Sequence, residues 1–389
     1  MNRINNKNIK RISGLVIVKD AENTIERCLK SLYEFCDDIV IVDTGCTDRT
    51  IQLIEDNIQD YKNTINIVKF DWINDYSAAR NFGLIHTKYD WVFFVDADEE
   101  VDKEGIETIK QVQLENFHNV QGIWIENGTS QFFGPRMELF NKNMVDKNGN
   151  FVNPCFKGAV HEYLDISQMD PESFGYMTIN INHYQAPSEI PERAKKYYQI
   201  SKKALLEGRL TNVHDWYMHG TVAHMANQEE EAKECMWIAI SLYKIMGAHL
   251  TSDIINCYDW LAMYYKNLGD VDKALALINE ACNIEERYDL YYNVGLIFLN
   301  QGKFSESLKA LERAEELAKE QIDPTHKYFI SKILDTYFIP VCKAIVYKNL
   351  EEYNKMREVL IPLMESSDLR SQEVEDLYNE AMLLMSSKS

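Results

Sequence analysis

The sequence lacks the features that define several large classes of protein. It contains no run of about 18 apolar residues, so we expect no transmembrane helix. Its polar start, MNRINNKNIKR, is followed by no apolar stretch of signal-peptide type, which favours a cytoplasmic location. The 8 cysteines form no CxxC pair, so we expect free thiols and neither a zinc finger nor a thioredoxin-like protein. The absence of GxxxxGKS, GxxxxGKT and GxGxxG argues against a P-loop NTPase and a Rossmann dehydrogenase.

Basic residues are also few. The chain of 389 residues has 41 Lys and Arg against 61 Asp and Glu, which gives a formal net charge of −20. A surface this acidic repels polyanionic backbones and anionic lipid, so neither nucleic acid nor a membrane surface is an expected partner. The length predicts two or three domains, and 46% hydrophobic residues is ordinary for a globular protein.

The first part of the chain alternates short apolar runs with helical periodicity. Such alternation, with strands that are apolar throughout, predicts a parallel sheet covered on both faces. The expected strands are 13–18, 38–42, 65–70 and 90–95, and the expected helices are 24–35, 47–54 (capped by Thr47 or Asp48) and 75–85.

Polar clusters follow three of these strands directly. They occupy residues 19–22, 43–48 and 96–100. Because ligands of such sheets bind beyond the carboxyl ends of the strands, we expect the three clusters to meet at one site.

The third cluster belongs to the stretch DWVFFVDADEEVD, residues 90–102. Carboxylates packed this densely repel one another, unless water or a cation reaches them. Asp96 and Asp98 are hard oxygen ligands suited to Mg²⁺ or Mn²⁺, which in turn bind phosphate oxygens. The alternative is the acidic first turn of a helix, which would account for Glu99, Glu100 and Asp102.

The second part of the chain changes character twice. Residues 121–185, with runs such as GIWIEN and MTININHY, predict an extension of the sheet with covering loops. From about residue 190 the composition is helical, and a pattern recurs after 33 residues: Tyr264, Gly269, Ala274 and Ala281 are followed by Ile297, Gly302, Ser307 and Ala314. This period is close to that of tetratricopeptide repeats, whose stacks offer a concave face to another polypeptide; an ordinary helical bundle is the alternative. We therefore expect domains at 1–190 and 191–389.

Five motifs, in their order along the chain, carry a resemblance to a known family. They are IVIVDTGCTDRT, WINDYSAARNFG, WVFFVDADE, GAVHE and a later HY. Together they resemble a family 2 glycosyltransferase, in the branch with a tetratricopeptide-like C-terminal part. That branch includes peptide S- and O-glycosyltransferases of glycosylated bacteriocins (glycocins) and cell-surface glycan transferases. The resemblance implies an α/β GT-A nucleotide-sugar-binding domain with a Rossmann-like mixed sheet, followed by an all-α helical repeat domain.

The resemblance also implies roles for single residues. Asp43 matches the residue that meets the uracil ring, Asp96 the one near the ribose, and Asp98 a metal ligand. Arg80 and Asn81 match a pair that steadies the nucleotide sugar, although Arg80 could instead form a structural ion pair with a carboxylate of the DxD motif. The implied nucleotide-sugar-binding set is Val18, Asp20, Asp43, Thr44, Arg80, Asn81, Asp96, Ala97 and Asp98.

Further roles concern the metal and the acceptor. His183 matches a second ligand, beside Asp98, for Mn²⁺ or Mg²⁺, although a lone histidine is often only a satisfied polar residue. The pair His161 and Glu162 falls near the acceptor, where an inverting transfer needs a base; Glu99 is an alternative base. Trp124 and Arg136 are expected walls of the sugar or acceptor pocket, with a core position equally open for Trp124.

Two positions depart from the family pattern. Lys19, Asp20, Ala21 and Glu22 stand where Lys-Asn-Glu-Glu is common, which leaves the preferred nucleotide in doubt. Cys46 stands where serine is usual, and it places a thiol near the nucleotide.

The expected function is an inverting, metal-dependent transfer of a hexose or N-acetylhexosamine from a UDP-sugar to a Cys, Ser or Thr side chain. The acceptor would be a peptide or protein docked on the repeat domain, and a homodimer is a further expectation. The first alternative keeps the chemistry but has a cell-envelope glycan or lipid-linked acceptor. The second is a non-catalytic helical-repeat scaffold.

Overall fold

The computed structural model describes residues 11–58, 64–114, 121–127, 136–184, 190–246, 251–321 and 334–388. The chain divides into two compact units, residues 1–211 with 221–228, and residues 212–220 with 229–389. No helix among the described residues is long and apolar enough to span a membrane. Most of the polar N-terminal stretch considered above lies outside the described residues. The expected domain boundary after residue 190 stays a prediction. It falls at the start of the helix at 190–206, whereas the two compact units divide after that helix.

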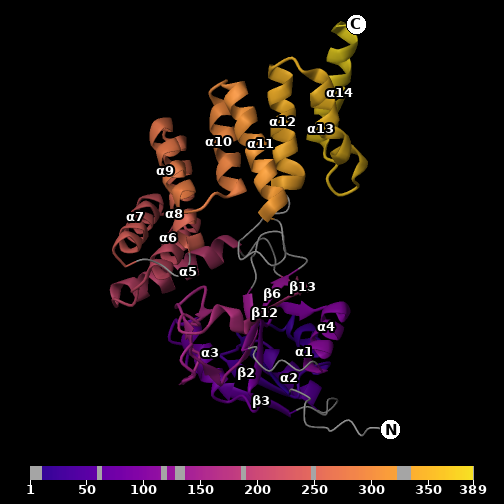
Figure 1. Cartoon of the computed structure of the whole chain (residues 1–389). Coiled ribbons are helices and arrows are strands. Elements are labelled where there is room, and N and C mark those ends of the chain that lie inside the picture. The colour runs from indigo at the N-terminus through magenta and orange to yellow at the C-terminus, as the bar shows by residue number, and fades with distance from the viewer. Residues whose placement is uncertain are drawn as a thin grey trace. The chain divides into compact units, whose positions relative to one another are not determined.

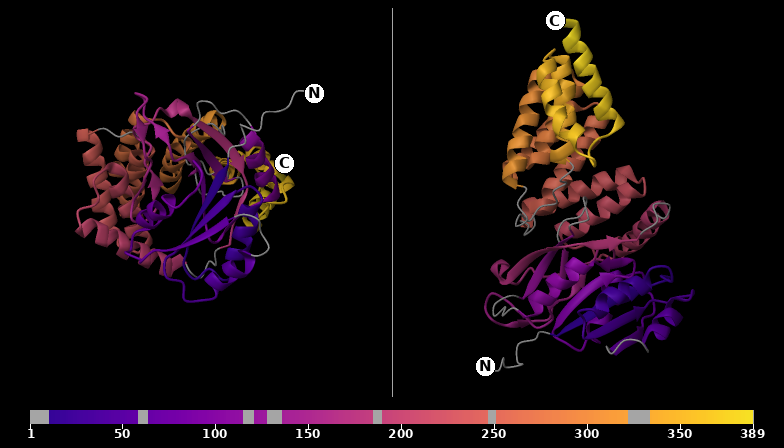
Figure 2. Two further views of the ribbon diagram at one scale, coloured as in Figure 1. Left: turned by 90° about the horizontal axis from the view of Figure 1, so that it is seen from below. Right: turned by 90° about the vertical axis from the view of Figure 1, so that its right-hand side faces the viewer.

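A seven-stranded mixed sheet organises the first unit, and Figure 2 (left) shows its strands side by side. Its order is β12-β6-β7-β4-β1-β2-β3, with β7 antiparallel to both neighbours and the remaining pairs parallel. The strands are β1 (Ile12–Val18), β2 (Asp38–Asp43), β3 (Thr64–Lys69), β4 (Trp91–Asp96), β6 (Gly122–Asn127), β7 (Arg136–Asn141) and β12 (Phe174–Ile179). The expected α/β fold class and the four expected strands are confirmed.

Helices cover both faces of this sheet. Successive residues of its strands point to opposite sides, and because both sides carry apolar residues, each face forms a core with the helices that pack on it. Val16, Ile41 and Phe93 face one core with residues of α1, α2 and α4, whereas Leu15 and Val40 face a second core with residues of α3. The helices of this unit are α1 (Ile25–Tyr33), α2 (Thr50–Ile58), α3 (Tyr76–Leu84), α4 (Lys103–Leu114) and α5 (Ile190–Leu206).

One helix begins later than expected. The pattern predicts a helix over 47–54 with Thr47 or Asp48 as its cap, but α2 begins at Thr50. The Asp48 carboxylate accepts hydrogen bonds from the Thr50 amide (2.9 Å) and hydroxyl (2.6 Å), which is the geometry of a residue that caps a helix from outside. Residues 47–49 therefore stay in the loop that follows β2.

Short elements lie around the sheet. The pair of β5 with β13 is important for the site, because it aligns Glu99 with His183 and Val101 with Ile181. Glu99 and Glu100 are thus strand residues, and only Asp102 caps a helix, by accepting the Gly105 amide at 2.7 Å. These elements are β5 (Glu99–Val101), β8 (Met144–Val145), β9 (Phe151–Val152), β10 (Phe156–Lys157), β11 (Tyr163–Leu164), β13 (Ile181–His183) and the 3₁₀ helix η1 (Pro171–Ser173).

The second unit is helical throughout its described residues, and successive helices pack side by side (Figures 1 and 2). Its 33-residue period shows in the turns, because Gly269 and Gly302 both have positive φ, at 83° and 69°. The helices are α6 (Val213–Met225, which spans the division between the units), α7 (Glu229–Met246), α8 (Thr251–Asn267), α9 (Val271–Ile284), α10 (Tyr288–Asn300), α11 (Phe304–Gln321), η3 (Leu334–Phe338), α12 (Ile339–Asn349), α13 (Tyr353–Glu365) and α14 (Gln372–Lys388).

Candidate active site

The carboxyl ends of three parallel strands bring the predicted residues to one edge of the sheet. The strand register pairs Val18 of β1 with Asp43 of β2, and Ile17 of β1 with Asp96 of β4. Asp43 and Asp96 therefore lie at the carboxyl ends of β2 and β4, the two strands that flank β1. The expected convergence of the polar clusters after β1, β2 and β4 follows from this register.

The loop after β2 is held by its own first residues. The Asp43 carboxylate accepts the amides of Gly45 (2.9 Å) and Cys46 (2.8 Å), and the Thr44 hydroxyl donates to the Val18 carbonyl at 2.9 Å. Burial opposes ionisation of Asp43, but these amides outweigh it and lower its pKa. Asp43 is thus a charged acceptor at the position expected to meet a nucleobase.

Asp20 ties the loop after β1 to the loop after β2. Its backbone has φ 51°, and its carboxylate accepts the Thr47 amide at 2.6 Å and the Asp48 amide at 3.3 Å. The Thr47 amide is the main reason that the pKa of Asp20 falls to about 2. This aspartate, at one of the positions that departs from the family pattern, therefore clamps the two loops together.

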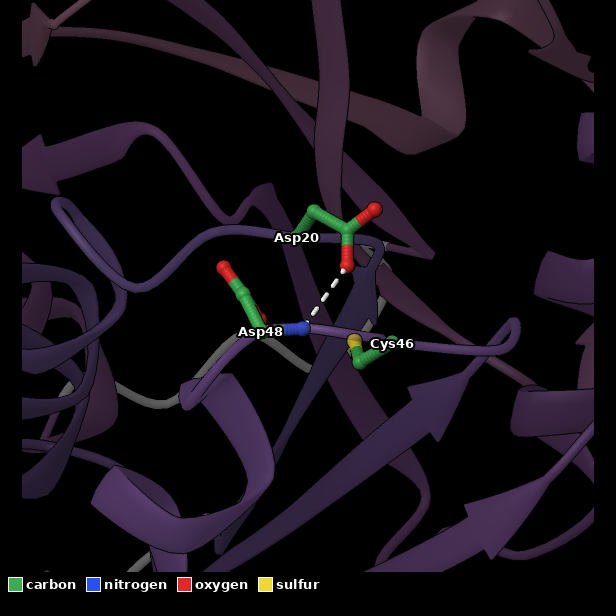
Figure 3. A group of neighbouring side chains, drawn as sticks. All are labelled: Asp20, Cys46 and Asp48. Atoms are coloured by element: carbon green, nitrogen blue, oxygen red, sulfur yellow. Dashed lines mark hydrogen bonds between the residues drawn. The ribbon is translucent and has the colours of Figure 1, made fainter.

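Asp20, Cys46 and Asp48 also form the one group of three metal-compatible side chains found among the described residues, and Figure 3 shows them around the Asp48 amide. Each carboxylate already accepts backbone amides: Asp20 as above, and Asp48 those of Glu22 (3.1 Å) and Thr50. Burial raises the pKa of the Cys46 thiol to about 11, so the thiolate that a metal needs is scarce at neutral pH. The hydrogen bonds of Asp20 and Asp48 therefore hold the loops after β1 and β2 together.

The antiparallel pair of β5 and β13 places the two predicted metal ligands together. His183 Nε2 and Asp98 Oδ2 are 3.1 Å apart, and the Tyr184 amide donates to the Asp98 carbonyl at 2.8 Å. The hydrogen bond to Asp98 raises the pKa of His183. Two adjacent ligands of an octahedral Mg²⁺, at about 2.1 Å from the ion, are about 3 Å apart, so this oxygen and nitrogen fit one divalent cation. Both side chains are only partly exposed, at 33% for Asp98 and 37% for His183.

Arg80 joins the metal side of the site to the side of the predicted base. It is 4% exposed on α3, and it donates from Nη2 to Asp96 Oδ1 (2.6 Å) and from Nε to Glu162 Oε1 (2.5 Å). Its guanidinium also lies 4.5 Å from the centre of the Phe94 ring. The expected alternative, an ion pair with a carboxylate of the DxD motif, is therefore present. Arg80 Nη1 is buried without a partner among the described residues, so this ion pair leaves one donor for a ligand.

Arg136 of β7 meets the same carboxylates from the other side. Its Nη2 contacts Glu99 Oε1 at 2.6 Å and Glu138 Oε1, and its Nη1 lies 3.9 Å from Asp96 Oδ2. Glu138, which the sequence reasoning missed, is 1% exposed, and its burial raises its pKa to about 8. The signal in the sequence that could have identified Glu138 is an acidic residue at the centre of the strand RMELF. Glu99 is buried between Arg136 and the Asp96 amide, which disfavours it as a base for an acceptor.

Three other expected residues have structural contacts. The Asn81 side chain pairs with both backbone groups of Phe156, at 2.9 Å and 2.7 Å, and so anchors β10. Trp124 packs against the second core, consistent with its core alternative, and Ala97 packs against the first. Binding roles for these residues stay predictions.

The two candidate bases lie on a loop with a strained backbone. His161 has φ 52° and is exposed, whereas the Glu162 side chain is 11% exposed and bonded to Arg80. The imidazole of His161 packs edge-to-face on Tyr197 of α5, with ring centres 5.5 Å apart. Tyr197 was not expected at the site, since the pattern assigns α5 to the helical domain.

Two parts of the chain match known protein families. Residues 13–173 match Glycosyl transferase family 2, and residues 255–288 and 288–321 each match a tetratricopeptide repeat. The first repeat begins within α8 and includes α9, and the second includes α10 and α11. The chain thus contains a stretch that matches family 2 glycosyltransferases, followed by two matches to tetratricopeptide repeats.

Individual proteins and solved structures are also similar to this chain. The chain is 26% identical to the SPbeta prophage-derived glycosyltransferase SunS of Bacillus subtilis over 239 residues, which are 59% of this chain and 53% of SunS. It is 23% identical over 321 residues to a TPR repeat-containing protein of Synechococcus elongatus, covering 82% of this chain and 68% of that one. A crystal structure of S. aureus TarS 1–349 is similar at 15% identity and TM-score 0.38, covering 72% of this chain and 93% of that crystallised chain. The chain spans about half the length of SunS.

Proposed function

We propose that the protein is an inverting glycosyltransferase that moves a hexose or N-acetylhexosamine from a UDP-sugar to a Cys, Ser or Thr side chain of a peptide or protein. The donor would bind with Mn²⁺ or Mg²⁺. The observation that carries this proposal is the close approach of Asp98 Oδ2 and His183 Nε2, 3.1 Å apart, beside an arginine that joins Asp96 to Glu162. The proposed cation ligands and the proposed base would thus lie together at one edge of the sheet.

Each part of the site has a task in this reaction. Asp98 and His183 would hold the cation, which when bound neutralises the charge that develops on the departing diphosphate. Asp43 would accept from the uracil ring, and the free Nη1 of Arg80 would donate to the nucleotide sugar. The interactions of Asp43 and Arg80 would thus both bind the donor, and neither would bind the acceptor.

Glu162 is the proposed base. Its Oε1 is held by Arg80, which leaves Oε2 to take the acceptor proton. The acceptor sulfur or oxygen then bonds to the anomeric carbon, and the bond from that carbon to the diphosphate oxygen breaks. The electron pair of that bond leaves with UDP. His161, exposed on the same loop, is the alternative base.

A polypeptide acceptor is supported by the repeats and by the likeness to glycocin glycosyltransferases. Tetratricopeptide stacks commonly hold a polypeptide on one face. The repeats would therefore dock the acceptor while the family 2 domain transfers the sugar. A cytoplasmic location, a homodimer and the lack of a nucleic-acid partner stay predictions.

A second candidate acceptor is a cell-envelope glycan. Parts of this chain are 36% identical over 92 residues to the lipopolysaccharide core biosynthesis glycosyltransferase LpsC of Rhizobium meliloti and 28% identical over 120 residues to a teichoic acid poly(glycerol phosphate) polymerase of Staphylococcus epidermidis. The donor chemistry would be unchanged.

Asp98→Ala tests the proposal. We expect UDP release from UDP-glucose or UDP-N-acetylglucosamine with Mn²⁺ to fall at least about 100-fold, because one of two protein ligands of the cation is lost. Glu100→Gln is the matched control, since Glu100 is a neighbouring carboxylate that bonds Tyr184 instead. Transfer by Asp98→Ala at the wild-type rate would contradict the metal site.

Intact-mass measurement of candidate acceptor peptides separates the two acceptors. A gain of one hexose or N-acetylhexosamine, absent with Asp98→Ala, would establish a peptide acceptor. Steady UDP release without a mass gain on any peptide would favour the glycan.

A further inference from the structure

α5 packs within the first compact unit, beside the loop that carries the candidate bases. Ile200 of α5 forms a buried apolar cluster with Val160, next to the candidate bases, and with Val222. The rings of Trp72, Tyr76 and Tyr197 pack against this cluster. The Tyr76 amide also donates to the Ala159 carbonyl at 3.0 Å. α5, the start of α3 and the loop before Glu162 therefore form one packed group.

Aromatic rings in this group lie in a row that ends at the exposed His161. Trp72 and Tyr76 have ring centres 4.8 Å apart, Tyr76 and Tyr197 are 5.8 Å apart, and Tyr197 and His161 are 5.5 Å apart. Each contact is edge-to-face, with interplanar angles of 65°, 80° and 81°. Contacts of this kind hold each ring in a fixed orientation. Tyr197 is only half-buried, so part of its surface stays open to a ligand.

Tyr197 also lies near the charges at both ends of the site. Burial raises the pKa of Tyr197 to about 12, and the negative charges of Asp96, Glu162 and Asp98 add to this increase, while Arg193 opposes it. These three carboxylates therefore belong to the electrostatic surroundings of the Tyr197 phenol.

We propose that the ring of Tyr197 forms a wall of the donor-sugar subsite, against which the hexose of the UDP-sugar packs. The hexose must lie between the diphosphate, held at Asp98 and His183, and the acceptor, deprotonated at Glu162. Tyr197 packs on His161, the neighbour of Glu162 in the chain, and the apolar face of a pyranose ring fits an aromatic wall. This inference rests on the proposed function and adds a residue from a helix that the sequence pattern assigns to the other domain.

The test compares the affinities of UDP and UDP-sugars for full-length variants. Tyr197→Ala should raise the Kd of UDP-glucose or UDP-N-acetylglucosamine about 10-fold in the presence of Mn²⁺, whereas the Kd of UDP should change less than about 2-fold, because UDP has no hexose. Tyr197→Phe should keep wild-type values, because it retains the ring. Tyr198→Ala is the matched control, since it removes the neighbouring tyrosine of the same helix and should leave both Kd values unchanged.

The outcomes separate this inference from the proposed function. If Tyr197→Ala binds the UDP-sugars with the same Kd as the wild type, Tyr197 is not a wall of the sugar subsite, and the proposed function is unaffected. An equal loss of UDP and UDP-sugar binding would overturn the inference too, since the residue would then only support the fold. Failure of the wild type to bind UDP or either UDP-sugar would overturn both.

Discussion

Arg80 is the residue on which the charges of the site depend most. It is almost fully buried, and its ion pairs with Asp96 and Glu162 join residues that are 16 and 82 positions away in the chain. A buried arginine keeps its charge at any physiological pH, and its planar fork suits two carboxylates at once. Arg80 thereby holds the proposed base at a fixed distance from the DxD motif.

Arg80→Met should therefore destabilise the first unit and stop the reaction. Removing one partner of a buried ion pair leaves an uncompensated charge, and a cost of about 3 kcal/mol is expected because Glu162 is only 11% exposed. Urea unfolding measures this cost. Arg80→Lys is the control: it keeps the charge but not the fork, so it should lose less stability while still slowing UDP release. A midpoint of unfolding for Arg80→Met equal to that of the wild type would contradict this account.

At the scale of elements, two helices depend on a glycine where they meet a neighbour. A Cβ on Gly83 of α3 would lie 2.6 Å from Val42 Cγ2 and closer still to Leu15. A Cβ on Gly295 of α10 would lie 2.7 Å from Leu311 Cδ2. Both are shorter than any ordinary van der Waals contact, so neither helix has room for an alanine.

Gly83→Ala and Gly295→Ala should each cost about 1–3 kcal/mol through overpacking, but in different units. Limited proteolysis with mass spectrometry reads out where cleavage begins. Gly83→Ala should expose new sites in the sheet domain, and Gly295→Ala new sites among the repeats, so each variant serves as the control for the other. Identical cleavage maps for the two variants would show that the units do not unfold separately.

At the scale of the whole molecule, α5 belongs with the first compact unit by its packing, and the chain from 229 onward belongs to the second unit. The net charge of −20 is spread over both parts. Residues 190–206 therefore pack with the sheet, although their composition resembles that of the repeats.

Two truncations test this division. A chain of residues 1–228 should keep UDP-sugar hydrolysis within about 3-fold of the full chain and lose most transfer to an acceptor, because the repeats that would dock the acceptor are gone. A chain of residues 1–189 should lose hydrolysis as well, since Tyr197 and the α5 side of the apolar cluster are removed. If both chains hydrolyse the donor equally well, α5 has no part in the site.

The sequence by itself determined the local and periodic features of this protein. The order of strands and helices up to residue 96, the DxD motif at the end of the fourth strand, and the glycines 33 residues apart at Gly269 and Gly302 all appear in the structure, with α2 shorter at its start than expected. These features depend on side-chain periodicity and on turn conformation, which neighbouring residues specify.

Only the tertiary structure decided which distant residues meet. The β5 and β13 pair sets Asp98 beside His183, the buried position of Arg80 directs its fork at Glu162, and the packing of α5 brings Tyr197 to His161. Such contacts depend on strand order, register and the docking of helices, and no local pattern in the chain encodes these. The burial of Glu138 shows the same limit: strand alternation places it on the same face as Arg136, but only the fold reveals that the pair is shared with Glu99.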